Sequence, residues 1–270
     1  MSVRILNVNK IKTVQRLFTA SSEDEDYPAN NLQTDNYSQT WRTEDVATAY
    51  TVVQDFGAAT ECDTCFLGNV NLTSSATVKI QANASDSWGA PSVDETITVS
   101  GLGLSPPHRN LYHELASAET YRYWRISISD TGNTNGFYEV GEWWLGSRTT
   151  LDATQQPEVE HREIYDRNNI EHVTEYLQKY VYSRADRRTF VLNFNKITKT
   201  TMNTLRALER AQDGSGLPFV FVLDTSATPY EGFFVRIAGD VTVEQSAPTY
   251  YDIPLTLEEE AAGQSLPAVE

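Results

Sequence analysis

The sequence has few cysteines and no long run of apolar residues. Only two of its 270 residues are cysteine, so a small fold held together by several disulfides is excluded. No apolar stretch approaches the roughly 20 residues that a membrane-spanning helix needs, and the first residues, MSVRILNVNKIKT, show no signal-peptide pattern. We therefore expect a protein that is made in the cytoplasm, does not insert into a membrane and leaves the cell only as part of an assembly.

Basic residues are scarce relative to acidic ones. The chain carries 21 Lys and Arg against 37 Asp and Glu, which gives a formal net charge of −16. A field of this sign repels nucleic acid phosphates and anionic lipids, so we expect no direct nucleic-acid binding. The acidity is compatible with a surface that DNA must slide past without adhering, and equally with a charge that only keeps the protein in solution.

Motifs of catalysis and metal binding are missing as well. The sequence contains no G-x-S-x-G elbow, no P-loop and no G-x-G-x-x-G, which indicates a protein that is not an enzyme and has no organic cofactor. Cys62 and Cys65 form a C-x-x-C pair, but a strand rather than a helix is expected to follow, and the four histidines are scattered. We therefore expect two reduced structural thiols.

The first half of the chain reads as a series of short β-strands. Apolar and polar residues alternate with the period of two of a half-buried strand within residues 48–56, 76–82, 95–101 and 123–129. Segments rich in Gly, Asn, Asp, Ser and Pro separate these runs, and no convincing helix intervenes. This pattern is typical of a β-sandwich or jelly roll, and we place that domain at residues 1–151.

The second half, residues 152–270, combines strands with one helix and predicts an α+β domain. Strands are predicted at residues 187–194, 217–224, 232–239 and 250–260. Between the first two strands, ITKTTMNTLRALERAQDGSG carries apolar residues at helical spacing. Thr198 or Thr200 can cap the start of this helix, and Gly214 or Gly216 can end it in a left-handed conformation. The protein is therefore expected to be mainly β, with one packed helix.

Several blocks of the first domain occur in an order that a known family shares. Residues 28–45 read PANNLQTDNYSQTWRTED, a strand ends in Asp-Phe-Gly, and Arg-Tyr-Trp-Arg-Ile precedes a last strand that contains Glu. Over residues 20–147 the chain resembles discoidin domains, also called coagulation-factor-type C or galactose-binding-like domains. It departs from their pattern at Thr34-Asp35-Asn36, where many members have Asp-Gly, so a turn there would need Asn36 at positive φ.

This resemblance implies a calcium site in the first domain. Some members of the family bind calcium near this loop, helped by a Glu on the last strand. The matching positions are Asp35, Thr40 and Glu142, and loop carbonyls could supply the remaining oxygens. A solvated Asp and a surface Glu are the alternative.

The adjacent tryptophans Trp143 and Trp144 raise the question of a glycan site. Successive residues of a strand point to opposite faces, so the resemblance places one ring in the core and the other at a sheet surface or against a neighbour. An exposed ring could stack on a sugar. Packing against a second domain or subunit is the competing explanation.

The second domain resembles the tail-tube-like and distal-tail modules of long-tailed bacteriophages. The resemblance rests on the strand RRTFVLNF, the helix, the Pro-Phe strand LPFVFVLD and the final YYDIPLTLEEE. Such modules form rings in which the sheets of neighbouring subunits pair, so that no hydrogen-bonding edge is left exposed. The alternative is an ordinary α+β domain that forms no ring.

Together, the two resemblances imply a structural virion protein, namely a distal tail or baseplate protein that is assembled in the host cytoplasm. They imply a homo-oligomeric ring around the DNA channel, with six subunits expected, and the tail-tube and baseplate hub proteins as partners. In RADRR, Arg187 and Arg188 are expected to face a partner subunit or a carboxylate such as Asp186. A carbohydrate-binding module of a surface or host-recognition complex, with a glycan ligand, is the alternative function.

Overall fold

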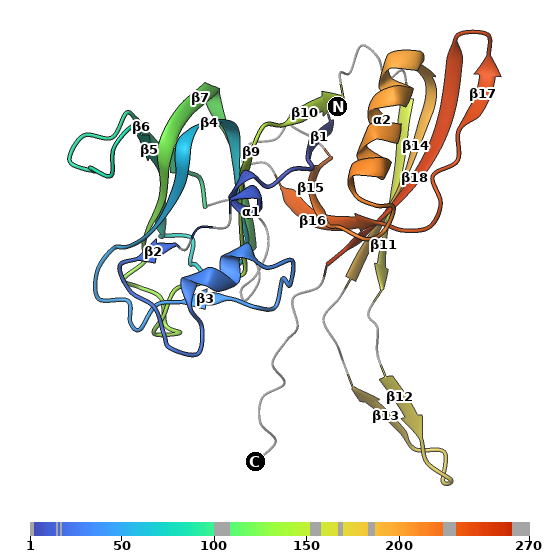
Figure 1. Cartoon of the computed structure of the whole chain (residues 1–270). Helices are drawn as coiled ribbons and strands as arrows, with labels where there is room; N and C mark the ends of the chain where they lie inside the picture. Colours follow the sequence, from blue (N-terminus) through green and yellow to red (C-terminus); the bar gives the residue numbers. More distant parts are fainter. Residues whose placement is uncertain are drawn as a thin grey trace. The chain divides into compact units, whose positions relative to one another are not determined.

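The computed structural model describes residues 3–14, 16, 18–99, 109–151, 158–166, 170–182, 187–223 and 231–260 (Figure 1). The chain divides into two compact units, and each is described by itself. The first unit comprises Met1–Leu151 with Phe219–Phe233, and the second comprises Asp152–Pro218 with Phe234–Glu270. None of the helices in the described ranges is long and apolar enough to cross a membrane.

The first unit is built on a β-sandwich whose two longest strands are neighbours. β4 (Tyr50–Val70) and β7 (Arg109–Ser129), of 21 residues each, pair antiparallel over most of their length. The strand order of this sheet is β2-β4-β7-β5-β6, and β9 also pairs with β4. The shorter strands of the sandwich are β2 (Thr19–Ala20), β3 (Trp41–Arg42), β5 (Thr77–Asn83), β6 (Val93–Ile97), β8 (Glu139–Val140) and β9 (Glu142–Gly146). β3 and β8 pair with each other.

The core of the sandwich follows from the alternation in the sequence. On β7, Trp124, Ile126 and Ile128 are fully buried, whereas the residues between them are less buried. β5 contributes Val78 and Ile80 to the same hydrophobic cluster. Burying each such side chain stabilises the fold by roughly 1.5–3 kcal/mol, and a slip of one residue in register would turn these side chains out of the core.

Three further strands of the first unit bring together segments that are far apart in the sequence. β1 (Val3–Leu6) pairs antiparallel with β10 (Thr149–Leu151) and with β15 (Phe219–Val222). The predicted division into residues 1–151 and 152–270 has the same break after Leu151 but gives Phe219–Phe233 to the other part. The sequence order could not reveal this exchange, because it depends on the long-range pairing of β1 with β15.

The second unit is a β-sheet with one helix. β14 (Arg187–Thr198) pairs with β11 (Glu158–Asp166) on one side and with β18 (Tyr250–Glu259) on the other. β18 also pairs with β16 (Gly232–Ile237) and β17 (Glu244–Ala247). A separate hairpin pairs β12 (Ile170–Val173) with β13 (Lys179–Tyr182). The buried residues Phe190, Leu192 and Phe194 of β14 alternate with less buried ones.

The helix of the second unit, α2 (Lys199–Ala211), agrees with the sequence prediction at both ends. Thr198 is the N-cap, and its side chain accepts a hydrogen bond from the backbone N–H of Thr201. Gly214 has a φ of +62°, the left-handed conformation expected after the helix. Met202, Leu205 and Leu208 form the buried face, and α2 lies along β14 and β18 (Figure 1).

The predicted fold class is confirmed: the protein is mainly β, with an N-terminal sandwich, a second β-sheet domain and one helix of several turns. The sequence analysis overlooked two short helical segments in the first half, α1 (Lys10–Thr13) and the 3-10 helix η1 (Ala29–Gln33). The expectation that Asn36 has a positive φ is wrong, since it is not among the described residues that do. The end of the predicted strand 95–101 and Asp186 lie outside the described residues.

Candidate functional site

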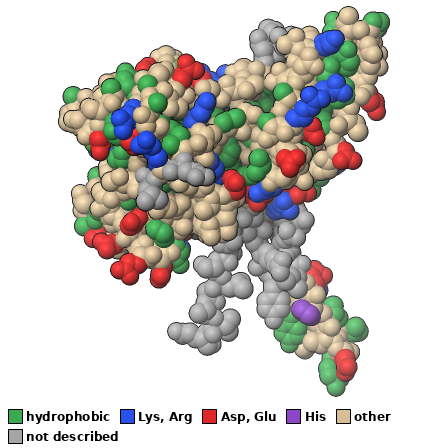
Figure 2. Space-filling model, in the orientation of Figure 1, with side chains coloured by type: hydrophobic (Ala, Val, Ile, Leu, Met, Phe, Trp, Pro, Cys, Tyr) green, Lys and Arg blue, Asp and Glu red, His purple; other side chains and the backbone are tan. Residues whose placement is uncertain are grey.

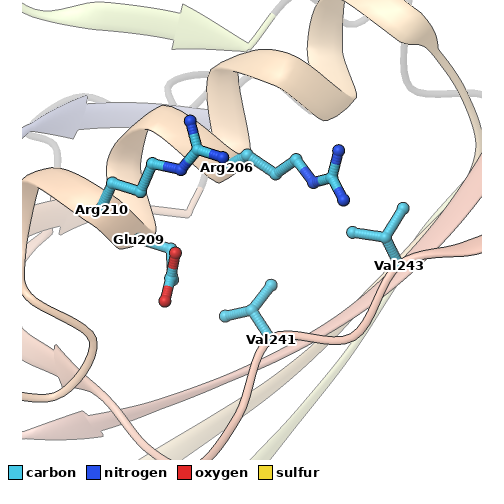
Figure 3. A pocket seen from close by; sticks show the side chains of 5 residues that line it. All are labelled: Arg206, Glu209, Arg210, Val241 and Val243. Carbon is cyan, nitrogen blue, oxygen red and sulfur yellow. The ribbon is translucent and has the colours of Figure 1, made fainter.

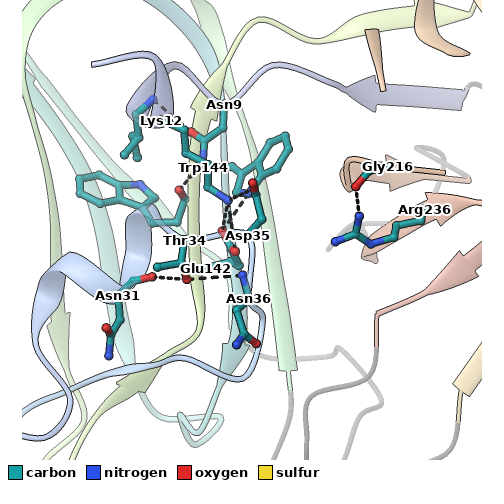
Figure 4. A network of polar contacts seen from close by, with 12 residues as sticks. Asn9, Lys12, Asn31, Thr34, Asp35, Asn36, Glu142, Trp144, Gly216 and Arg236 are labelled. Atoms are coloured by element: carbon teal, nitrogen blue, oxygen red, sulfur yellow. Dashed lines mark hydrogen bonds and ion pairs between the residues drawn. The ribbon is translucent and has the colours of Figure 1, made fainter. Parts of the chain in front are cut away.

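The predicted calcium ligands Asp35 and Glu142 share a neighbour, the ammonium group of Lys12. Lys12 Nζ lies 2.7 Å from Asp35 Oδ1 and 3.1 Å from Glu142 Oε2 (Figure 4). The Glu142 side chain is completely buried, whereas that of Asp35 is 50% exposed. Lys12 thus connects a surface turn to the core strand β9. We call these three residues the Lys12 cluster.

Two local turns position the Lys12 cluster. Asn9 caps α1 by accepting a hydrogen bond from the N–H of Ile11, and it also donates to the carbonyl of Trp143 on β9. These contacts hold the single turn of α1 against β9, which places Lys12 beside Glu142. On the other side, the Thr34 hydroxyl donates to the carbonyl of Asn31 at the end of η1. This bond orders the turn that carries Asp35.

The calcium site stays a prediction, and the Lys12 cluster counts against it. Calcium needs six to eight oxygen ligands, but here an ammonium group already contacts both carboxylates and supplies the positive charge. Thr40 is buried, and no hydrogen bond of its hydroxyl joins it to either acid in the described structure. No group of three or more His, Cys, Asp or Glu in the described ranges could hold a metal ion. The residues present therefore do not fit a calcium ion.

Burial dominates the electrostatics of the Lys12 cluster. Loss of hydration raises the pKa of Glu142 to about 8. The Lys12 ammonium opposes this rise, as does the indole N–H of Trp144, which donates to Glu142 Oε2 at 3.0 Å. Glu142 therefore takes up a proton within a few pH units of neutrality, and the strength of its link to Lys12 depends on pH.

Both tryptophans of the adjacent pair are buried, and Trp143 belongs to the hydrophobic cluster of the sandwich. Trp143 is fully buried and stacks on Phe18, with ring centroids 5.5 Å apart. Trp144, on the other face of β9, is only 3% exposed. Its ring lies under the Lys12 ammonium group, 5.3 Å from the centroid. Glycan binding by Trp143 or Trp144 stays a prediction, but neither ring offers an open face.

The C-x-x-C pair consists of two free, buried thiols, as the sequence predicts. Cys62 and Cys65 both lie on β4 and are fully buried. Residues three apart on a regular strand point to opposite faces, and the ladder with β7 has an irregularity between Cys62 and Thr64. Burial raises the pKa of Cys62 to about 12 and raises that of Cys65 further. The thiolate needed for redox or metal chemistry is therefore disfavoured.

Arg187 and Arg188 bind carboxylates of their own sheet. Arg188 forms a two-pronged pair with Glu259, with contacts of 2.7 and 2.8 Å. Arg187 lies 2.5 Å from Glu258, which is next to Glu259 on β18. The expected carboxylate partner is thus present, although it comes from β18. A role of Arg187 and Arg188 in an oligomer interface stays a prediction, and these ion pairs leave less of their charge for a partner.

An exposed apolar surface covers β11 and the hairpin. Seven of the ten exposed large hydrophobic residues in the described ranges fall within residues 164–181. They are Ile164, Tyr165, Val173, Tyr176, Leu177, Tyr180 and Val181. Figure 2 shows hydrophobic side chains, in green, over the hairpin. Ile164 and Tyr165 are neighbours on a strand and point to opposite faces, so both faces of β11 are open there.

The turn of the hairpin presents one acidic and two apolar side chains. The N–H of Leu177 donates to the carbonyl of Thr174 at 2.9 Å, which closes a β-turn with Glu175 and Tyr176 at its corners. Leu177 has a φ of +63°, a conformation that glycine or asparagine adopts more easily. Tyr176 and Leu177 are 90% and 85% exposed. We call residues 173–177 the hairpin tip.

The second unit also carries a hollow beside its helix. It has a volume of about 290 Å³ and is lined by Arg206, Glu209, Arg210, Val241 and Val243 (Figure 3). Arg206 and Arg210 are one turn apart on α2 and are exposed. We call this feature the α2 hollow. Its two guanidinium groups outnumber the one carboxylate, that of Glu209, and together with the two valines they suit a ligand that has a carboxylate next to an apolar group.

Comparisons with known proteins concern the first domain. The family model described as the XRCC1 N terminal domain matches residues 9–106. The N-terminal domain is a β-sandwich, part of which is similar to this family. No curated protein matches the chain.

Solved structures similar to this chain include carbohydrate-binding modules. Chitosan-binding module 1 of a chitosanase/glucanase from Paenibacillus sp. IK-5 is 20% identical, with a TM-score of 0.38, over 51% of this chain and 96% of that one. The family 32 module of NanJ from C. perfringens, in complex with galactose, is 13% identical, with a TM-score of 0.38, over 54% and 99%. Reduced XRCC1 bound to the DNA pol beta catalytic domain is 17% identical, with a TM-score of 0.37, over 48% and 93%. At this identity the likeness concerns the fold alone.

Neither Lys12 nor the apolar hairpin was predicted from the sequence. Lys12 lies 23 residues from Asp35 and 130 residues from Glu142, so no local pattern links the three. In the sequence, the apolar residues YVY next to charged residues are a sign of a strand, but the polar residues on either side resemble a linker.

Proposed function

We propose that the protein is a structural subunit of a bacteriophage tail tip or baseplate, where copies assemble into a ring around the DNA channel. The observation that carries this proposal is the exposed apolar surface of β11 and the hairpin. Monomeric proteins rarely expose large contiguous apolar patches, and a lone two-stranded hairpin is only marginally stable in water. A surface of this kind indicates a structural partner.

The edge of the second sheet supports self-assembly. Among the described strands, β11 pairs with β14 on one side and with no strand on the other. An open edge can pair with another chain, and an exposed edge is an aggregation risk unless it is covered. Head-to-tail contacts between identical subunits close into a ring when the rotation permits. We propose six subunits, with the tail-tube and baseplate hub proteins as neighbours.

The charges of the second unit are compatible with a channel for DNA. Arg187 and Arg188 are paired with Glu258 and Glu259, so these arginines are not available as free phosphate ligands. The chain as a whole carries a formal charge of −16, which disfavours adhesion of nucleic acid. A wall of this character lets DNA pass without binding it.

Mass measurement combined with negative-stain imaging tests the proposal. The purified full-length protein, alone or mixed with its tail-tube and hub partners, is expected to give a closed ring with a central opening. The protein should also be found in purified virions. A protein that stays monomeric with these partners and is absent from virions would refute the assignment.

The second candidate function is a carbohydrate-binding module, favoured by the galactose-binding-like first domain. Because Trp143 and Trp144 are buried, the aromatic side chain to test is the half-buried Trp88, whose ring stacks against Arg125 with 4.2 Å between the guanidinium carbon and the ring centroid. Strong binding on a glycan array that Trp88→Ala abolishes, without loss of folding, would favour this function over the structural one.

A further inference from the structure

The second unit carries two unpaired charged groups of opposite sign, each beside apolar side chains. Glu175 at the hairpin tip has no ion-pair partner in the described part of the chain, although the nearby Glu171 pairs with Lys179 at 2.6 Å. Arg206 and Arg210 of the α2 hollow likewise have no ion pair within the described ranges. Glu209 lines the same hollow, so the two guanidinium groups there outnumber the carboxylate.

We propose that the hairpin tip of one copy docks into the α2 hollow of a second copy. This contact rests on the proposed ring assembly and names the surfaces that form it. The Glu175 carboxylate accepts hydrogen bonds from the guanidinium groups of Arg206 and Arg210, whose N–H groups donate in a forked geometry. Tyr176 and Leu177 cover the two valines of the α2 hollow.

The chemistry of the two surfaces matches in charge and in size. The tip offers one carboxylate followed directly by two apolar side chains that are at least 85% exposed. The hollow offers two guanidinium groups, the single carboxylate of Glu209 and two valines, in a volume of about 290 Å³, so positive charge is in excess there. That volume is at the small end of ligand pockets, roughly 300–1,000 Å³, so it suits a few side chains rather than a large cofactor.

The backbone of the tip is consistent with a binding role. Leu177 occupies a left-handed position with φ +63°, where glycine would avoid strain that costs on the order of 1–3 kcal/mol. A leucine in this strained conformation therefore indicates that its side chain takes part in a contact. Buried against Val241 and Val243, it would recover part of that cost through removal of apolar area from water.

A second copy is the proposed recipient of the tip. Docking between copies uses two different surfaces, the head-to-tail arrangement that closes a ring. The cross-linking experiment below distinguishes docking between copies from docking within one copy.

Charge exchange tests the contact in the full-length protein. Glu175→Arg, and separately Arg206→Glu with Arg210→Glu, should each raise the concentration required for association by roughly tenfold or more, because like charges then meet. Combining all three changes should restore association to within a few fold of the wild type. Glu61→Arg, an exposed change of the same charge in the first unit, is the matched control and should have no effect.

Cross-linking tests which copy receives the tip. Gln178→Cys places a thiol next to the tip and Thr242→Cys places one between the two valines, and both positions are exposed. The native thiols Cys62 and Cys65 are fully buried and do not interfere. A mixture of the two single variants should form a disulfide-linked dimer under mild oxidation, whereas each variant alone should not.

The outcomes separate this contact from the proposed function. If rings form normally and neither charge reversal weakens them, the docking is refuted but the proposed ring assembly is not. Dimers from Gln178→Cys alone would indicate a tip-to-tip contact and also overturn it, as would a cross-link found only when both cysteines are in one chain. Rescue by the combined charge exchange, together with a cross-link only in the mixture, would support the docking.

Discussion

Replacing Lys12 by methionine tests the Lys12 cluster most directly. The change keeps the length of the side chain and removes the ammonium group that lies 3.1 Å from Glu142 and 2.7 Å from Asp35. Glu142, fully buried, keeps only the indole N–H of Trp144 as a donor in the described network. It must then either remain as an unpaired buried carboxylate or take up a proton.

The expected loss of stability follows from the distance between Lys12 and Glu142. At 3.1 Å and an effective dielectric constant of about 20, Coulomb's law gives about 5 kcal/mol for the pair, before any cost of dehydrating the charges. Breaking a buried ion pair from one side typically costs about 3–5 kcal/mol. Because the Lys12 side chain is 16% exposed, solvent screens part of this. We expect Lys12→Met to destabilise the first unit by about 2–4 kcal/mol when Glu142 is ionised.

The loss should depend on pH in a defined direction. Burial raises the pKa of folded Glu142 to about 8, from an ordinary value of 4.5, so its protonated form stabilises the fold at low pH, and this stabilisation is lost as pH rises toward 8. Removing Lys12 removes a group that lowers this pKa, so in the variant the loss continues above pH 8. The difference between wild type and variant should be small at pH 5 and largest near pH 9.

Urea unfolding followed by tryptophan fluorescence measures this difference. All five tryptophans lie in the first unit, so the signal reports on that unit. With a slope of about 2 kcal/mol per molar urea, the midpoint at pH 9 should fall by about 1–2 M. Lys10→Met, two residues away on the same short helix, is the matched control. A midpoint shift that is equal at pH 5 and pH 9, or equal in both variants, would refute the reasoning.

Three further outcomes are expected. Adding calcium to the wild-type protein should leave its melting temperature unchanged, because Lys12 supplies the positive charge between Asp35 and Glu142. A rise of several degrees at millimolar calcium would instead support a calcium site. Thr198→Ala should destabilise the second unit by about 1 kcal/mol, because it removes the α2 cap, whereas Thr198→Ser should not; equal losses in a circular-dichroism melt would contradict the cap. Arg122 and the backbone N–H of Gly57 lower the pKa of Asp55 to about 2, although burial opposes this. The contribution of Asp55 to stability should therefore be complete above pH 4 and lost as pH falls toward 2. An Asp55→Asn variant whose stability depends on acid pH as that of the wild type does would contradict this.

The sequence alone identified much of the fold, because the signals that specify these elements are local. The buried and exposed residues of β7 and β14 alternate in the order in which they are written, and strand pairing on a buried face fixes that period. The cap at Thr198, the apolar face of α2 and the turn at Gly214 are all encoded within 17 consecutive residues. The short alternating strands of the first domain likewise indicated its β-sandwich.

The candidate sites were less accessible to sequence reasoning. The resemblance assigned Asp35 and Glu142 to a calcium site, but the cation that contacts both in the structure is Lys12, which no spacing rule connects to either. For the second of the two tryptophans, exposure and packing against a neighbour were both left open, because a strand pattern says which face a residue points to and not what covers that face.

By itself the sequence therefore determined the class of each element, the acidic character of the protein and the presence of two free thiols in a strand, since these depend on composition and on neighbours within a few residues. Only the tertiary structure decided that Phe219–Phe233 groups with the first unit through β15 and β1, that an ammonium group contacts the buried carboxylate of Glu142, and that Arg187 and Arg188 are paired within their own sheet. Each of these depends on contacts between residues separated by about 70 positions or more, whose free energies arise only when the chain has brought them together and removed the surrounding water.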